Sequence, residues 1–207
     1  MARYVFFSFA YDDVKNFKVN VVRHSWLIKH SEETFTDGSI WEKEKTKGST
    51  AIMKLIDSGM NKTSVTAVLI GEETANRRWV NYEIVKSFDK GNGILAININ
   101  RIRGKHQAIS ARGLNPLDRL AFQISEDGKK IRFYELINRK WVVYSDLPEI
   151  NNKKSNTLYF DDSFWRGNDF GKSFRFSEKF DTYCWIIDDG HKNFSSWVEE
   201  AAEQAGR

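Results

Sequence analysis

The run SVTAVLIG, residues 64–71, decides the fold class of this chain. It is a short apolar segment with β-branched residues that ends at a glycine, which is typical of a strand buried on both faces. A helical pattern follows, with Thr74 as its predicted N-cap and Lys90 near its end. Apolar residues return at 94–99 (ILAINI), which predicts the next buried strand. A strand, a helix and a second strand in this order are typical of a parallel sheet.

The same alternation extends toward the N-terminus. Residues 4–9 (YVFFSF) predict a buried strand, and residues 33–36 predict a weaker one. A helix is expected to begin at Asp12 or Asp13, and another covers residues 49–58. The first of these helices carries four apolar residues at helical spacing, Val14, Phe17, Val21 and Ile28. The pattern predicts an α/β fold with a doubly wound parallel sheet and helices on both faces.

In such a sheet, ligands bind beyond the carboxyl ends of the strands. Ser8 and Phe9 close the first predicted strand, Asp37 follows the second, and Gly71 follows the third. We therefore expect these four residues to lie near one rim of the sheet.

The second half of the chain breaks the alternation. Two strand-like runs, at 122–125 and 131–137, flank Glu126–Lys130 and predict a β-hairpin, and a third run follows at 141–144. A helical pattern closes the chain. We interpret residues 1–207 as a single domain with a core at 1–100, an inserted hairpin region at about 101–155, and a closing segment at about 156–207.

Composition and motifs exclude several classes of protein. A single cysteine rules out an internal disulfide framework and favours a reducing, cytoplasmic location. The N-terminus has no signal-peptide pattern, and no apolar run approaches the ~20 residues that span a bilayer. The hairpin region has a charge of +6 in a chain whose net charge is +4, but no nucleic-acid-binding module is recognisable. Metal-ligand spacings, a Walker A sequence and a dinucleotide fingerprint are also missing from the sequence.

Glu83 is the best candidate for a catalytic residue. Val80, Ile84 and Phe88 form the apolar stripe of their helix, and Glu83 flanks this stripe beside Trp79. A carboxylate beside an indole at a ligand-binding rim suits a sugar or nucleotide site. The spacing alone favours the alternative, a solvated Glu83 that pairs with Lys86 on the helix surface, because a tryptophan four residues before a glutamate is a weak motif.

The chain contains, in this order, the segments VFFSF (5–9), FTDG (35–38), GSTAIMKLIDSG (48–59), SVTAVLIG (64–71) and NRRWVNYE (76–83). Segment by segment, this order resembles a TIR domain and, within that family, the TIR-like proteins of the Thoeris anti-phage system. The likeness extends from the core to the late segment at 188–198. The cysteine that follows the tryptophan in the family is Val80 here. The matching residues are Ser8, Phe9, Gly48, Val68 to Gly71, Trp79 and Glu83.

This resemblance implies an enzyme that cleaves NAD at the nicotinamide–ribose bond and makes a cyclic ADP-ribose isomer, a second messenger that activates a partner effector protein. Glu83 is then the catalytic residue. NAD is expected to be the substrate, with no further cofactor, no metal, no nucleic acid and no membrane partner, and self-association is a further expectation. The substrate-binding candidates are Ser8, Phe9, Asp37, Trp41 and Trp79.

Two other functions remain open at this level. Many TIR domains act as interaction modules without catalysis. A nucleoside deoxyribosyltransferase-like enzyme would share the doubly wound sheet and a reactive glutamate. The intact Trp79 and Glu83 favour the NAD-cleaving enzyme over the interaction module, and the order of the segments favours it over the transferase.

Overall fold

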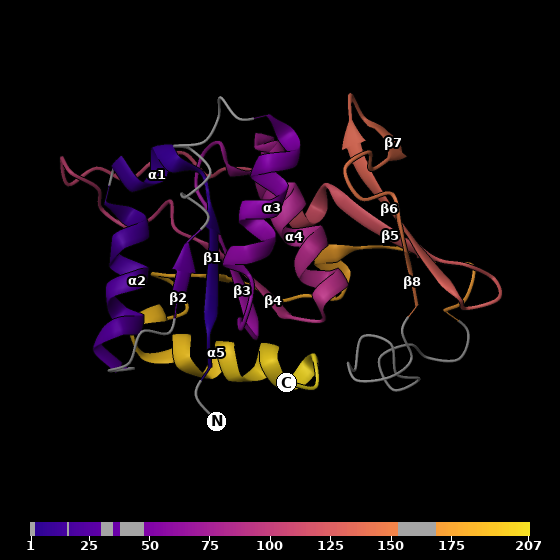
Figure 1. Ribbon diagram of the computed structural model, residues 1–207. Helices are drawn as coiled ribbons and strands as arrows, with labels where there is room; N and C mark the ends of the chain where they lie inside the picture. Colours follow the sequence, from indigo (N-terminus) through magenta and orange to yellow (C-terminus); the bar gives the residue numbers. More distant parts are fainter. Residues whose placement is uncertain (1–2, 16, 30–34, 38–47, 153–168) are drawn as a thin grey trace.

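A five-stranded parallel sheet, named sheet A here, confirms the predicted fold class. The computed structural model describes residues 3–15, 17–29, 35–37, 48–152 and 169–207. Within them, the strand order of sheet A is β10-β4-β3-β1-β2, and all neighbouring strands run parallel (Figure 1). Its strands are β1 (Val5–Phe9), β2 (Phe35–Asp37), β3 (Val65–Ile70), β4 (Gly93–Asn98) and β10 (Thr182–Cys184).

Helices cover both faces of sheet A (Figure 1). They are α1 (Tyr11–Lys15), α2 (Lys18–Lys29), α3 (Ser49–Gly59), α4 (Arg78–Lys90) and α5 (Gly190–Gln204). Helices α2 and α5 share one face, where the ring centroids of Trp26 and Phe194 lie 5.4 Å apart. Successive strand residues point to opposite faces. Leu69 of β3 therefore joins the α2 and α5 side, whereas Val68 joins α4.

A second, antiparallel sheet, named sheet B here, contains the predicted hairpin. The order of its strands is β7-β6-β5-β9, and β8 also pairs with β6. The strands are β5 (Leu120–Ile124), β6 (Lys130–Ile137), β7 (Lys140–Val143), β8 (Glu149–Asn151) and β9 (Ser173–Arg175). The hairpin is confirmed, but it is part of a larger sheet, because β9 from the closing segment pairs with β5.

Helix α4 lies between the two sheets. Its residue Phe88 stacks on Phe122 of β5 with ring centroids 5.0 Å apart, and it meets Phe133 of β6 edge-on at 5.7 Å. Both rings of sheet B are completely buried, as is Phe88. One apolar cluster thus joins β3, α4 and sheet B, and the helix that carries Glu83 is held from two sides.

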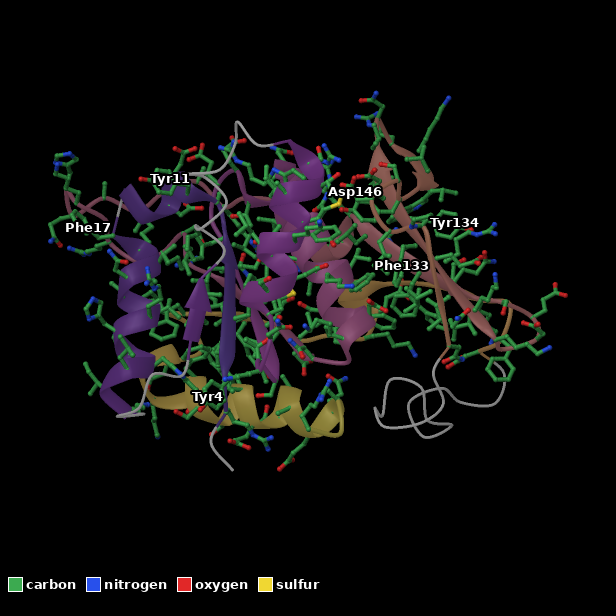
Figure 2. The ribbon with its side chains drawn as sticks, in the orientation of Figure 1. Tyr4, Tyr11, Phe17, Phe133, Tyr134 and Asp146 are labelled. Atoms are coloured by element: carbon green, nitrogen blue, oxygen red, sulfur yellow. The ribbon has the colours of Figure 1, made fainter. Side chains whose placement is uncertain are left out.

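The helix expected after β1 is broken in two. Phe17 adopts a left-handed backbone with φ 62°, and this separates α1 from α2. Its ring is 52% exposed and points away from the body of the protein (Figure 2), and Ile28 is 84% exposed. Their helical spacing in the sequence does not correspond to one continuous helix face, because the break resets the helical phase. Val19, Val22 and Trp26 form the buried face of α2 instead.

Thr74 does not cap the helix of Glu83, as the sequence had suggested. It begins a single turn of 3-10 helix, Thr74–Asn76, and α4 starts only at Arg78. The Thr74 hydroxyl accepts a hydrogen bond from the Gly71 backbone N–H at 2.9 Å, so it shapes the turn that leaves β3. The C-terminal end of α4 is as predicted, because Gly91 takes the left-handed conformation with φ 69°.

Candidate active site

Ser8 and Glu83 form a buried hydrogen-bonded pair between β1 and α4. The Ser8 hydroxyl donates to Glu83 Oε2 at 2.5 Å, and both residues have an exposed fraction of 0%. This distance is in the range of hydrogen bonds between a hydroxyl and a charged carboxylate. The alternative of a solvated Glu83 paired with Lys86 is wrong, because Lys86 forms its ion pair with Asp89 at 2.9 Å.

Further hydroxyl groups continue this contact along the interface between α4 and sheet A. One turn after Glu83, the Ser87 hydroxyl donates to the Glu83 backbone carbonyl at 2.7 Å. The same hydroxyl lies 2.6 Å from the hydroxyl of Thr66 on β3. The position of Glu83 is therefore fixed through its side chain by β1 and through its own helix by β3.

Trp79 lies one helical turn before Glu83 and is half-buried. Its ring meets Tyr82 edge-on with centroids 6.3 Å apart, and the Arg78 guanidinium lies 4.7 Å from the ring centroid. It packs against the small apolar cluster of α3, which includes Ile52. A partly exposed indole beside the Ser8–Glu83 pair can wall a site and still contact a flat ligand group.

The other predicted site residues are less closely associated with Glu83. Phe9 is 1% exposed, and its ring belongs to the cluster of α2 and α5, on the face of sheet A opposite to α4. Asp37 ends β2 level with Phe7 of β1, two residues before β1 itself ends. Nothing is described of its side chain, and Trp41 lies outside the described residues.

A second buried polar cluster lies at the same rim and was missed from the sequence. Asp13 of α1 is 7% exposed, and its carboxylate occupies the space beside Gly71, where an added Cβ would lie 2.0 Å from Asp13 Oδ2. Burial raises the pKa of Asp13 to about 6, against the opposing effect of a hydrogen bond from Thr74. The sequence offered Asp13 only as a helix cap, and the close packing against Gly71 depends on the tertiary fold.

Lys18 links this cluster to the loop after β4. Its ammonium donates to the Asn100 backbone carbonyl at 3.0 Å and to the Ser110 hydroxyl at 2.7 Å. Burial lowers the pKa of Lys18, and the negative charge of Asp13 counteracts this shift. The two residues hold α1, α2 and the loop together beside the carboxyl ends of β1 and β3.

The chemistry available at the described residues is that of a carboxylate, a hydroxyl and an aromatic ring. No group of three or more His, Cys, Asp or Glu residues is placed to hold a metal ion in the part of the chain that the structure describes. No helix among these residues is long and apolar enough to cross a membrane. The pair of Ser8 and Glu83 suits a reaction in which positive charge develops next to the carboxylate.

Comparison with known proteins points to the same chemistry. The family model described as "Thoeris protein ThsB, TIR-like domain" matches residues 6–103. The chain is also 44% identical over 202 residues to a protein of Bacillus cereus (strain MSX-D12), named "Putative cyclic ADP-D-ribose synthase ThsB1". That match covers 96% of this chain and 100% of the relative.

Proposed function

Because the chain belongs to the family of Thoeris ThsB TIR-like proteins, we propose that it cleaves the nicotinamide–ribose bond of NAD and closes the ADP-ribose moiety into a ring. The name of the Bacillus cereus relative, "Putative cyclic ADP-D-ribose synthase ThsB1", supports this reaction. The supporting observation in the chain itself is the buried Glu83 carboxylate, held by the Ser8 hydroxyl at 2.5 Å. NAD is then consumed as a substrate and is not a resident cofactor.

One carboxylate is sufficient for this reaction. A glycoside hydrolase needs a general acid to protonate its leaving oxygen and a second carboxylate as base or nucleophile. The nicotinamide of NAD is a cationic pyridinium, so it leaves as a neutral molecule without protonation. The remaining demand is to stabilise the positive charge that builds up on the ribose, and Glu83 supplies the opposite charge.

Ring closure requires the same pocket to exclude water. The ribose cation is captured either by water, which gives linear ADP-ribose, or by a group of the same molecule. A wall such as the Trp79 indole holds the substrate folded, which favours capture within the molecule through its effective concentration. The cyclic product then diffuses to a partner effector protein as a messenger.

The complete burial of Glu83 has a consequence for activity. A substrate ribose reaches a carboxylate with an exposed fraction of 0% only after the groups that cover it have moved. We therefore expect low basal activity from this conformation, as in a resting enzyme. A resting state of this kind would keep a defence enzyme from draining the NAD of its own cell.

Glu83→Gln tests the proposal. The amide oxygen still accepts a hydrogen bond from Ser8, so the fold should persist, but the charge that opposes the ribose cation is lost. We expect nicotinamide release to fall by about 100-fold or more. Circular dichroism checks the fold, and liquid chromatography with mass detection measures the products, both from purified protein and from cells challenged with phage.

The products distinguish the proposal from its alternatives. A compound with the mass of cyclic ADP-ribose, absent with Glu83→Gln, supports it. Linear ADP-ribose alone would mean a simple NAD hydrolase, and base exchange on a deoxynucleoside would mean a deoxyribosyltransferase. If no reaction is detected in either assay and the protein self-associates in a concentration-dependent way, an interaction module becomes the best account.

A further inference from the structure

A basic depression lies at the edge of sheet A opposite to the Ser8–Glu83 rim. It has a volume of about 590 Å³ and lies where β1, β3 and β4 begin, at the edge where Tyr4 is seen (Figure 2). We call it the basal depression. Its described lining contains four cationic residues and no carboxylate side chain. The lining residues are Arg3, Tyr4, Met60, Lys62, Thr63, Ser64, Lys90, Asn92 and Arg207.

Two of the cations are held in place by contacts with loop groups. Arg207 Nε donates to the Gly91 backbone carbonyl at 2.9 Å, and a terminal nitrogen donates to the carbonyl of Lys90. These bonds use two of the five N–H donors of a guanidinium. The Lys90 ammonium donates to Asn61 Oδ1 at 3.1 Å. The two cationic groups are thus held in position by neutral hydrogen-bond acceptors, and these acceptors do not cancel the positive charge.

The remaining two cations differ in their surroundings. Arg3 is neutralised by an ion pair with Glu199 at 2.7 Å, and Glu203 lies close enough to favour its charged form further. Lys62 is exposed on the loop between α3 and β3, where its φ is 70°. Among the described side chains, Lys62, Lys90 and Arg207 are therefore the lining cations that form no ion pair with a carboxylate.

Nearby positive charges add to the effect of burial on the pKa of Lys90. It is lowered first by burial and then by the charge of Lys86, with a further contribution from Arg207. Asp57 and Asp89 act in the opposite direction but do not reverse the shift. A bound anion would relieve this repulsion.

The lining of the basal depression also offers an aromatic surface, because the Tyr4 side chain is 40% exposed. A flat ring next to cationic groups is a common arrangement for a ligand that has both an aromatic part and a phosphate. The volume of about 590 Å³ is within the usual range for small-molecule sites.

We propose that the basal depression binds a nucleoside phosphate, with the phosphate between Lys62, Lys90 and Arg207 and the base against Tyr4. This site is separate from the proposed NAD site. Tyr4 and Ser8 are four positions apart along an extended strand, a distance of about 13 Å. A ligand in the basal depression does not reach Glu83, so it would act as an effector.

Binding of AMP, adenosine and inorganic phosphate to the purified chain tests the proposal, measured by isothermal titration calorimetry. We expect AMP to bind more tightly than either adenosine or phosphate, and more weakly as salt screens the charges. Lys62→Glu should weaken AMP binding by about tenfold or more, and Lys62→Gln by less. Neither substitution introduces a glycine or a proline, so we expect both variants to keep the backbone conformation of position 62. Lys192→Glu, an exposed lysine at the other end of α5, serves as the matched control and should bind AMP normally.

Three results would overturn the proposal. Equal AMP binding by Lys62→Glu and the unaltered protein would place the nucleotide elsewhere. Loss of AMP binding in a folded Trp79→Ala variant, with normal binding by Lys62→Glu, would place it at the Glu83 rim. Phosphate binding as tight as that of AMP would leave an inorganic anion site without a nucleoside subsite. Because the readout is binding, failure of this proposal is distinguishable from failure of the proposed NAD reaction.

Discussion

At the scale of single residues, the Ser8 hydroxyl gives the Glu83 carboxylate a partner inside the protein. The two residues are 75 positions apart, and the hydrogen bond between them depends on α4 packing across β1. A buried ionised group without partners is costly, whereas a hydrogen-bonded one is tolerated. The requirement that Ser8 hold Glu83 therefore explains a serine in a strand whose other four residues are Val or Phe.

Ser8→Ala should lower both stability and activity. It removes a donor from a buried carboxylate, and such a loss typically costs about 1–3 kcal/mol of unfolding free energy. Nicotinamide release should fall as well, because Glu83 loses the hydrogen bond that positions it. Urea unfolding and the NAD assay measure the two effects, with the exposed Ser58→Ala as control. Unchanged stability would show that the 2.5 Å hydrogen bond contributes nothing in solution.

Asp13→Asn should remove a pH-dependent penalty on stability. The pKa of Asp13 is about 6 in the folded protein and near 3.9 in an unfolded chain. The folded state therefore binds more protons between these values, so stability falls as pH rises from about 4 to about 6. The advantage of Asp13→Asn should grow over this interval, by up to about 2–3 kcal/mol.

Urea unfolding of both proteins at several pH values between 4 and 7 checks this sign. The Asn side chain still accepts a hydrogen bond from Thr74, and any difference in packing between the two side chains would add only an offset that does not vary with pH. A difference in stability that stays flat with pH would show that the pKa of Asp13 is not perturbed.

At the scale of elements, the close approach of α5 to the start of β4 depends on Gly93. An added Cβ at this position would lie 2.3 Å from the backbone carbonyl oxygen of Ala201 and 2.9 Å from the nitrogen of Ala202. Both are backbone atoms, so no side-chain rearrangement can make room. The glycine is therefore required by helix–sheet packing.

Gly93→Ala should destabilise the protein by about 1–3 kcal/mol, the usual cost of overpacking in a core. The helix α5 would have to move away from sheet A, which would loosen the stacked pair of Tyr183 and Trp197, whose centroids are 4.2 Å apart. Urea unfolding measures the loss, and tryptophan fluorescence reports on the displacement. A variant as stable as the parent would mean that α5 has room to shift without loss of packing.

Elements with a strong local pattern were predictable from the sequence. Strands β1, β3 and β4 are short apolar runs, and all their residues are buried. The hairpin of β5 and β6 was predictable from the polar segment between two apolar runs. The break at Phe17 was not, because its left-handed backbone has no glycine to mark it in the sequence.

The candidate site was only partly predictable for a similar reason. Trp79 and Glu83 lie on one helix, so their spacing suggested a shared site. The burial of Glu83 depends on a hydroxyl from β1, and that of Asp13 on Gly71 after β3. Neither arrangement has a signature in the local sequence. The side of sheet A that Phe9 faces is fixed by the register of β1, which a short apolar run leaves undefined.

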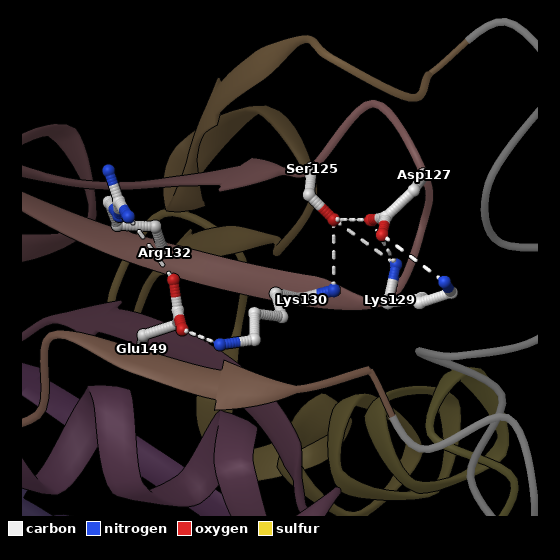
Figure 3. Close-up of polar contacts among 6 residues, drawn as sticks. All are labelled: Ser125, Asp127, Lys129, Lys130, Arg132 and Glu149. Atoms are coloured by element: carbon white, nitrogen blue, oxygen red, sulfur yellow. Dashed lines mark hydrogen bonds and ion pairs between the residues drawn. The ribbon is translucent and has the colours of Figure 1, made fainter.

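At the scale of the whole molecule, the turn of the β5–β6 hairpin is distant from the Ser8–Glu83 pair, but its strands are not independent of α4. The Ser125 hydroxyl donates to Asp127 Oδ1 at 2.6 Å and closes the turn (Figure 3). Lys130 opens β6 and pairs with Glu149 at 2.6 Å. Rings from both strands form the core around Phe88. Only the turn itself can therefore be exchanged safely.

Replacement of residues 126–129 by a short turn with glycine should leave NAD cleavage within a few-fold of the parent. The exchange spares Lys130, β5 and β6, so the core around α4 remains. Phe122→Ala provides the contrast, because loss of a buried Phe typically costs about 3–5 kcal/mol. If the turn variant folds but cannot cleave NAD, the turn must belong to the active site.

The position of β10 at the edge of sheet A has a consequence for how the protein is made. β4 receives its outer neighbour only when Thr182–Cys184 have been synthesised, and α5 covers one face of sheet A later still. At about 5–20 residues per second, translation leaves roughly 4–17 s between β4 and β10. During this interval the nascent chain exposes an open strand edge and the apolar surface that α5 will cover. Holdase chaperones at the ribosome should therefore raise the soluble yield, and a pause in translation between β4 and β10 should lower it.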